Sequence, residues 1–449
     1  MSFSESVSKW ETEKLSLLAD YISRGITPKY TDDKNQSILV VNQRCIREGK
    51  VLFEDARRHD IEKKKVSEEK FLRDFDVLVN STGVGTLGRV SQIKKVYEPT
   101  TVDSHVTIVR GNSDYIDKKY LGYAIKAQQS IIENMAEGST GQTELSRKRL
   151  GDEIVIGFPK NKQEQKAIAH ILSTLDDKIE VNNQINKTLE NMAQAIFKQW
   201  FVDFEFPNED GEPYKSSGGE MVESELGMIP KGWEVGSFSE YISSMLGGDW
   251  GKDSPQGNYT QKVYCLRGAD INDIVAGNKG KMPERYIIEK NLIKKKLNSG
   301  NLVVEISGGS PTQSTGRIAY VSSDLLKRYN SPLVATNFCR AIKLKKDEHM
   351  EFFYNYWKAL YQNNVFFHYE NGTTGIKNLD ISSFIERHPI VIPNENIIKM
   401  FTHQVKLFYK MHQNYGVENS QIETLRDSLL PKLMSGEIRV PMDEEGDVS

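Results

Sequence analysis

Apolar residues recur at alternating steps of three and four along two long segments of the chain. This heptad spacing is typical of a helix with a single apolar seam. The first seam consists of Ile168, Leu172, Leu175, Ile179, Asn182, Asn186, Leu189, Ala193 and Ile196. The second consists of Ile398, Phe401, Val405, Phe408, His412, Tyr415, Asn419 and Ile422. Each seam carries two polar residues near its middle, which weaken a helix pair but fix its register.

A helix over residues 163–200 would be about 57 Å long at about 1.5 Å per residue. An apolar seam of that length needs a partner, and the second heptad segment is the obvious one. We therefore predict that the two helices pair as an antiparallel coiled coil. His412 is expected to be a structural seam residue, and Gly416 to cost the second helix about 1 kcal/mol relative to alanine.

Glycine-containing motifs recur in the same order in the two halves of the chain. Trp10 precedes Gly25 by 15 residues, and Trp233 precedes Gly248 by the same distance. The other pairs are Leu87-Gly88-Arg89-Val90 with Thr315-Gly316-Arg317-Ile318, Gly138-Ser139-Thr140-Gly141 with Gly372-Thr373-Thr374-Gly375, and Ile154–Pro159 with Ile390–Pro393. The offset grows only from 223 to 234 residues. Four ordered matches make chance a poor explanation, so we predict two copies of one unit.

The globular part of each copy is predicted to be mixed α and β. Residues 75–80 and 301–306 are strand-like, and helices are plausible at 118–134 and 350–363. The predicted fold class is α+β, with two mixed domains, each followed by a long helix, in a pseudo-twofold arrangement. The expected divisions are a first globular domain at 1–160, a helix at 161–202, a surface linker at 203–230, a second globular domain at 231–394, a helix at 395–437 and a C-terminal tail at 438–449.

Composition narrows the class of protein. The 449 residues are 38% hydrophobic and 27% charged, which is enough to bury real cores. A net charge of −3 excludes a uniformly basic surface but allows a local basic face. The three cysteines form no CxxC pair, so neither a disulfide framework nor a cysteine zinc site is expected. The polar N-terminus and the lack of a long apolar run lead us to expect a cytoplasmic protein.

The sequence contains partial matches to two cofactor-binding motifs, but neither match is complete, and the catalytic motifs searched for are absent. Residues 83–88 match GxGxxG, but a strand-like run follows where the dinucleotide fold needs a helix. Residues 247–253 lack the upstream glycine and the hydroxyl residue of a phosphate loop. HExxH, GxSxG and Pro-Pro are absent from the sequence. We therefore expect no catalytic, cofactor-binding or metal-binding residues in this chain.

Polar and cationic side chains gather around the repeated glycine motifs instead. Short hydroxyl and amide groups suit phosphate oxygens and base edges, and Arg and Lys add charge. The candidates in the first copy are Arg24, Thr27, Lys29, Asn80, Ser81, Thr82, Arg89, Thr140, Gln142, Thr143, Arg147, Lys148 and Arg149. Those in the second copy are Trp250, Lys252, Thr312, Gln313, Ser314, Arg317, Thr373, Thr374, Lys377 and Asn378. For any one residue, a plain polar turn is an equally good explanation.

Three segments resemble the conserved regions of Type I restriction-modification specificity subunits. The first is the helix with Gln163-Glu164-Gln165-Lys166-Ala167-Ile168-Ala169, Leu175-Asp176-Asp177-Lys178-Ile179, Asn182-Asn183 and Thr188-Leu189-Glu190. The second is Ser224-Glu225-Leu226-Gly227-Met228-Ile229-Pro230-Lys231-Gly232-Trp233. The third is Leu429-Leu430-Pro431-Lys432-Leu433-Met434-Ser435-Gly436-Glu437-Ile438. The likeness covers nearly the whole chain.

The resemblance implies a function for each part. The two globular domains would be target recognition domains that read the halves of an asymmetric, bipartite DNA site. The helices would hold the domains apart. The chain itself would be non-catalytic and without cofactor, and would bind double-stranded DNA, two modification subunits and restriction subunits. S-adenosylmethionine, ATP and Mg²⁺ would act on those partners, in adenine-N6 methylation and ATP-dependent cleavage of DNA.

Two other classes of function remain open. A single-chain nuclease with two DNA-reading domains would need an acidic metal site that the sequence does not reveal. A scaffold without DNA contacts would tolerate charge reversal at residues 147–149.

Overall fold

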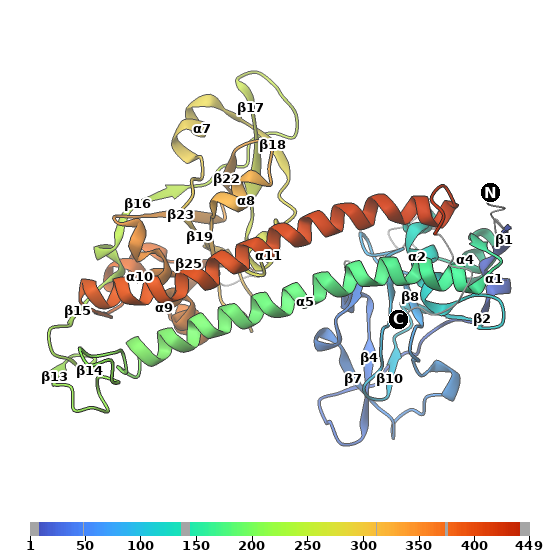
Figure 1. Ribbon diagram of the computed structural model, residues 1–449, viewed down its shortest axis with the longest axis horizontal. Coiled ribbons are helices and arrows are strands. Elements are labelled where there is room, and N and C mark those ends of the chain that lie inside the picture. The colour runs from blue at the N-terminus through green and yellow to red at the C-terminus, as the bar shows by residue number, and fades with distance from the viewer. Residues whose placement is uncertain (1–8, 48, 136–143, 311, 373–375, 441–449) are drawn as a thin grey trace, which may run out of the picture. The chain divides into compact units, whose positions relative to one another are not determined.

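The computed structural model describes residues 9–440 apart from 48, 136–143, 311 and 373–375. The chain forms two compact units, one of residues 1–177 with 423–449 and one of residues 178–422. The division falls inside two long helices, α5 (Lys162–Phe201) and α11 (Glu395–Ser435), so each helix contributes to both units (Figure 1). No helix among the described residues is long and apolar enough to cross a membrane.

The first unit contains two four-stranded sheets, ordered β2-β11-β8-β9 and β10-β4-β7-β3. Their strands are β2 (Ala19–Arg24), β3 (Tyr30–Thr31), β4 (Ser37–Val41), β7 (Arg57–Asp60), β8 (Val77–Asn80), β9 (Val90–Gln92), β10 (Thr100–Val102) and β11 (Val106–Gly111). Short pairings join β1 (Trp10–Lys14) to β12 (Val155–Pro159) and β5 (Ile46–Arg47) to β6 (Lys50–Val51). The helices are α1 (Leu15–Leu18), α2 (Lys118–Ala127), α3 (Gln129–Asn134) and α4 (Arg147–Glu153).

The second unit repeats this plan with sheets ordered β16-β23-β19-β21 and β22-β17-β18. Their strands are β16 (Ile242–Gly247), β17 (Tyr259–Leu266), β18 (Glu284–Ile288), β19 (Leu302–Glu305), β21 (Ile318–Tyr320), β22 (Leu333–Ala335) and β23 (Cys339–Leu344). The smaller strands are β13 (Met221–Ser224), β14 (Gly227–Pro230), β15 (Glu234–Gly236), β20 (Ser307–Gly308), β24 (Glu370–Asn371), β25 (Lys377–Leu379) and β26 (Ile390–Ile392). The helices are α6 (Ile271–Val275), α7 (Glu289–Lys295), α8 (Ser323–Lys327), α9 (Met350–Gln362) and α10 (Ile381–Arg387).

The main sheets of the two units correspond, although β3 of the first unit has no counterpart in the second. The sheets β2-β11-β8-β9 and β16-β23-β19-β21 are antiparallel throughout, and β8 and β19 occupy the same position in them. In the other sheet, β4 pairs in parallel with β10, as β17 does with β22. The β1–β12 pair matches β15–β26, since each ends next to a long helix. The predicted α+β fold class is confirmed, and the repeated motifs mark repeated topology.

The central strands explain why both sheets stay together. Every residue of β8 and β19 is buried. Val77 and Val79 belong to one apolar cluster, whereas Leu78 belongs to another. A strand with both faces covered favours a continuous apolar run, which is the run that the sequence predicted.

The repeated glycines are required by close contacts at matching places. A side chain at Gly25 would overlap the carbonyl group of Val102, and one at Gly248 would overlap that of Thr336. Gly88 and Gly316 both have positive φ angles, +82° and +98°, that disfavour other residues. The backbone can therefore approach Val102 and Thr336 this closely only because Gly25 and Gly248 have no side chain.

The segment predicted to be a surface linker, 203–230, lies mostly at the surface but is anchored to the second core. Phe206 is buried and its ring stacks on Tyr214 at 4.6 Å and on Trp233 at 4.9 Å between centroids. Ile229 is buried in the same cluster. Phe206 and Ile229 thus fix this segment to the second unit, which the acidic, turn-forming sequence around them did not indicate.

The start of the predicted C-terminal tail is also folded into its unit. Arg439 forms a double hydrogen bond with the buried carboxylate of Glu164, at 2.7 and 2.9 Å. Gly436 lies against the ring of Trp10, where a side chain would not fit. The acidic residues 443–447 lie outside the described residues.

In the second unit, α5 and α11 run antiparallel. Asn182 donates to Asn419 at 2.9 Å, while further along α5 the ring of Phe197 lies 6.0 Å from that of Phe401. Asn419 also donates to Asn183 at 2.9 Å. A matching pair of charges, Asp176 with Arg426, joins the helices in the first unit at 2.7 Å.

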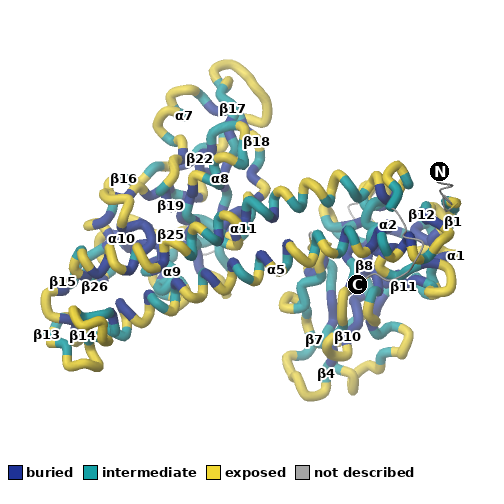
Figure 2. Tube along the Cα trace, in the orientation of Figure 1, coloured by how far each residue is buried: buried dark blue, intermediate teal, exposed yellow. Residues whose placement is uncertain are grey.

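The seam residues differ in burial (Figure 2). Buried positions are Ile168, Leu172, Ile179, Asn182, Asn186, Leu189, Ala193, Ile398, Phe401, Val405, His412 and Asn419. Partly buried positions are Leu175, Ile196, Phe408, Tyr415 and Ile422. Near the end of α5, Phe197 and Trp200 carry the buried stripe in place of Ile196.

Two polar seam residues, Asn186 and His412, form hydrogen bonds with the end of α6 and the loop after it rather than with the other long helix. The bonds run from Asn186 to the carbonyl of Ala276 (3.3 Å), from His412 Nε2 to that of Val275 (2.9 Å) and from Arg328 to that of Gly277 (2.8 Å). Burial lowers the pKa of His412, which keeps the ring neutral. Gly416 does not interrupt α11, and its missing side chain is what lets Gly277 approach the helix.

We predict that Gly416→Ala destabilises the protein although alanine favours helices. The propensity gain is about 1 kcal/mol, but the methyl group would overlap the Gly277 backbone, and overpacking costs about 1–3 kcal/mol. Thermal unfolding should show a lower Tm for Gly416→Ala. The matched control is Asn414→Ala, an exposed position of the same helix, which should leave Tm unchanged or raise it. A rise in Tm for Gly416→Ala would show that the loop does not depend on this contact.

Candidate functional site

Three candidate residues of the first unit, Arg24, Asn80 and Thr82, lie close to the end of β8. Asn80 is buried and its side chain donates to the carbonyl of Gln43 at 3.0 Å. Thr82 shares a hydrogen bond of 2.8 Å between its hydroxyl and His105 Nδ1. Arg24, at the end of β2, forms an ion pair with Glu144. Hydroxyl, amide and ionic groups from four segments thus meet at one end of the sheet.

The equivalent end of β19 in the second unit carries different side chains. Arg317 forms two hydrogen bonds with Glu305, at 2.7 and 2.6 Å. Beyond them, the Ser307 hydroxyl is hydrogen-bonded to Asn378. Lys377 pairs with Glu370 at 2.8 Å.

The same backbone hydrogen bonds support both sites. The N–H of Ser81 donates to His105 at 2.8 Å, and that of Ile306 donates to Phe338 at 2.8 Å. The N–H of Leu145 donates to Ser81, and that of Leu379 to Ile306, both at 2.8 Å. We call this shared arrangement the strand-end frame. It fixes equivalent positions in space within each unit while the side chains on it vary.

The loops after Gly25 and Gly248 are held in a similar way. Lys70 donates to the carbonyl of Gly25 at 2.9 Å, and Lys295 to that of Gly248 at 2.7 Å. In the second unit, the guanidinium of Arg285 lies 4.3 Å from the ring centre of Trp250. Trp250 is therefore presented at the surface in a fixed orientation.

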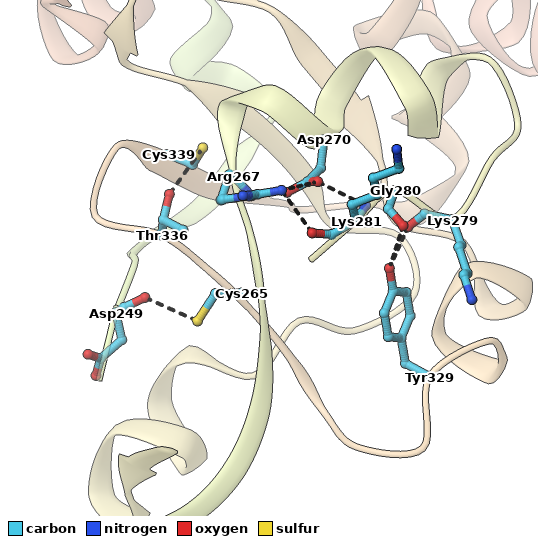
Figure 3. Close-up of polar contacts among 10 residues, drawn as sticks. All are labelled: Asp249, Cys265, Arg267, Asp270, Lys279, Gly280, Lys281, Tyr329, Thr336 and Cys339. Atoms are coloured by element: carbon cyan, nitrogen blue, oxygen red, sulfur yellow. Dashed lines mark hydrogen bonds and ion pairs between the residues drawn. The ribbon is translucent and has the colours of Figure 1, made fainter. Parts of the chain in front are cut away.

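Cys265 contacts the second loop at Asp249, and the pair of Arg267 with Asp270 lies on the neighbouring turn (Figure 3). Cys265 Sγ lies 3.6 Å from the carbonyl of Asp249, and burial raises the pKa of this thiol to about 12. Arg267 binds both carboxylate oxygens of Asp270 at 2.9 Å. All three cysteines are free and buried. They are structural groups rather than nucleophiles.

Some predicted residues build the site and others are open at its surface. Arg24, Asn80, Ser81, Arg89, Arg149, Ser314, Arg317 and Lys377 are buried or bonded within their unit. Thr27, Lys29, Arg147, Lys148, Trp250, Lys252, Thr312, Gln313 and Asn378 are exposed, and Thr82 is half-buried. Thr140, Gln142, Thr143, Thr373 and Thr374 lie outside the described residues.

Sequence reasoning missed residues on the turns that lead into β11 and β23. His105 and Phe338 lie on the strand-end frame, and Arg340 follows in β23, but no glycine motif or lysine run marks them. The only available signal was the strand that follows each turn. Because β11 and β23 pair antiparallel with β8 and β19, the turn before each of them lies beside the end of β8 or β19.

Across the described ranges, one group of side chains has the spacing of metal ligands: Glu348, His349 and Glu395. Lys346 pairs with Glu395 at 2.9 Å and so supplies positive charge there. Burial alone would raise the pKa of Glu395, but bonds from Lys346 and His349 lower it to about 2. A lysine in that place makes the group an ion-pair cluster rather than a metal centre.

Residues 7–191 match the family described as the Type I restriction modification DNA specificity domain. The specificity subunit of the Type I restriction enzyme HindI from Haemophilus influenzae is 22% identical, over 93% of this chain and 98% of its own length. The specificity subunit of MjaIX from Methanocaldococcus jannaschii is 28% identical, over 73% of this chain and 70% of its own. Residues 7–191 therefore carry the domain of that family, and the relatives that align over most of this chain are Type I specificity subunits.

The fold agrees with that family. A crystal structure of a Type I restriction-modification S subunit from M. genitalium superposes with a TM-score of 0.50 at 17% identity, covering 97% of this chain and 98% of that one. The family match covers the first copy, and the HindI specificity subunit aligns with both copies.

We predict that reversing the charge of Arg147 and Lys148 weakens DNA binding by the assembled complex. Both side chains are exposed at the start of α4. If both contact phosphates, their loss should reduce the salt-dependence slope by about 2, because each phosphate contact releases roughly one counterion. Fluorescence anisotropy over a salt series on Arg147→Glu/Lys148→Glu measures this.

The control for that experiment is Arg149→Gln. Arg149 is bound to Glu153 at 2.6 and 2.8 Å, so its loss should lower Tm more than it changes the salt slope. An unchanged slope in the double variant would mean that this face does not touch DNA.

Proposed function

We propose that this specificity subunit reads an asymmetric, bipartite DNA site, with one half-site for each globular domain. The domains at residues 1–160 and 231–394 would be the target recognition domains. The observation that carries the proposal is the strand-end frame. It recurs in both units with the same hydrogen bonds but with Asn80, Thr82 and His105 in one and Glu305, Ser307 and Phe338 in the other. Equal backbones with unequal side chains suit two different half-sites.

The helices α5 and α11 would act as the spacer between the half-sites. Pseudo-twofold placement on a duplex would put the half-site centres about one helical turn, roughly 34 Å, apart. The exposed candidate residues, among them Lys29, Arg147, Lys148 and Lys252, would contact phosphates or base edges. Residues bound within their unit would position them.

The partners would be two modification subunits and the restriction subunits of one complex in the cytoplasm. Modification subunits would methylate adenine with S-adenosylmethionine, and the restriction subunits would cleave unmethylated DNA with ATP and Mg²⁺. The family assignment supports this division, since specificity subunits are the non-catalytic part.

The carboxylates at the central strands disfavour a single-chain nuclease. Asp76 is buried and bound by Arg110 at 2.9 and 2.7 Å, and Glu305 is bound by Arg317. A catalytic carboxylate must be free to bind a metal ion. Both groups serve here as internal ion pairs.

The decisive experiment is to co-express this chain with its modification subunit and map methylated adenines across the host genome. We expect a split motif whose halves differ, with an adenine methylated in each half. A stable complex that methylates a continuous or symmetric motif would overturn the bipartite reading. Failure to form any complex with modification subunits would overturn the assignment of partners.

A further inference from the structure

One exposed ring side chain occupies the same turn position in each unit. The turn between β10 and β11 runs from Asp103 to Val106, closed by an N–H to carbonyl bond of 3.3 Å. The turn between β22 and β23 runs from Thr336 to Cys339, closed by the equivalent bond of 3.0 Å. The third residue is His105 in the first turn and Phe338 in the second.

The backbone of this position is held firmly while its side chain is open. The carbonyl of His105 accepts the N–H of Ser81 at 2.8 Å. The carbonyl of Phe338 accepts the N–H groups of Ile306, at 2.8 Å, and of Ser307, at 3.2 Å. His105 is exposed, and Phe338 keeps 59% of its surface exposed. Each ring therefore extends from the strand-end frame without being part of a core.

The surroundings of the two rings differ in chemistry. His105 uses Nδ1 to bond the Thr82 hydroxyl, which leaves Nε2 as the ring's second polar atom. Phe338 has no polar atom, but Arg340 reaches back to its turn and donates to the carbonyl of Asn337 at 3.3 Å. A phenyl ring beside hydroxyl, amide and guanidinium groups can add only an apolar contact.

We propose that His105 and Phe338 are specificity-determining residues that contact bases, one in each half-site. His105 hydrogen-bonds a base edge through Nε2. Phe338 packs against the C5-methyl group of a thymine, the apolar group that base pairs present in the major groove. The inference rests on the proposed bipartite recognition and adds which position on the frame reads a base.

The test uses the full chain in complex with modification subunits, and compares methylation motifs of the wild type and four variants. Phe338→Ala should lose its preference for thymine at one position of one half-site, by about tenfold in methylation rate. Phe338→Leu, which keeps an apolar contact, should retain that preference. His105→Ala should relax one position of the other half-site. Tyr115→Ala removes an aromatic side chain that is 61% exposed elsewhere on the first unit and should change neither half.

A synthetic duplex isolates the methyl contact. Replacing the identified thymine by uracil removes only the methyl group. It should weaken binding by the wild-type complex about as much as Phe338→Ala does, and should weaken the Phe338→Ala complex no further.

The inference is overturned if Phe338→Ala and His105→Ala leave the motif unchanged, or if either relaxes both halves equally. It is also overturned if uracil weakens the wild-type and Phe338→Ala complexes by the same factor. A wild-type complex that methylates no split site would instead overturn the proposed function. The two failures are therefore distinguishable.

Discussion

The seam between α5 and α11 buries amide and imidazole groups that must find partners, and this requirement organises the second unit. Asn182, Asn186, His412 and Asn419 are all at least nine-tenths buried. A buried polar group without a hydrogen bond costs free energy, so only a register that supplies partners is stable. Asn182 donates to Asn419, and Asn419 donates to Asn183, which favours one register of the two helices. Asn186 and His412 bind carbonyls of the loop after α6, which sets where the domain sits on them.

The strand-end frame is the same in both units, but the side chains on it differ, so one fold presents two different sets of polar groups. Arg89 and Arg317 occupy equivalent places after a glycine with positive φ. Arg317 is tied to Glu305, whereas the first unit has Asn80 there, and Arg89 donates to the carbonyl of Gly85 instead. The backbone positions are constant because glycines and buried strands fix them. The side chains are free to vary because the frame does not depend on them.

Much of the architecture could be predicted from the sequence, because local spacing encodes it. The heptad steps predicted two helices, and the observed bounds differ from 163–200 by only a residue or so at each end of α5. The repeated glycines predicted a duplication because the close contacts at Gly25 and Gly248 admit no side chain. Long-range contacts were not predictable. Phe206 and Arg439 lie in polar, turn-forming sequence, and only their distant partners, Trp233 and Glu164, show that they are anchored.

The sequence indicated where polar and cationic residues cluster, but not which of them bind DNA and which form internal ion pairs. A cationic residue near a glycine motif can bind DNA or complete an ion pair, and the sequence cannot separate the two. Arg24, Arg149 and Arg317 form ion pairs with carboxylates of their own units, while Arg147 and Lys148 are exposed. These three arginines therefore stabilise the fold of their units, whereas the side chains of Arg147 and Lys148 stay accessible. Phosphate contacts carry no sequence information by themselves, so the short polar groups on the strand-end frame are the ones suited to discriminate between DNA sequences.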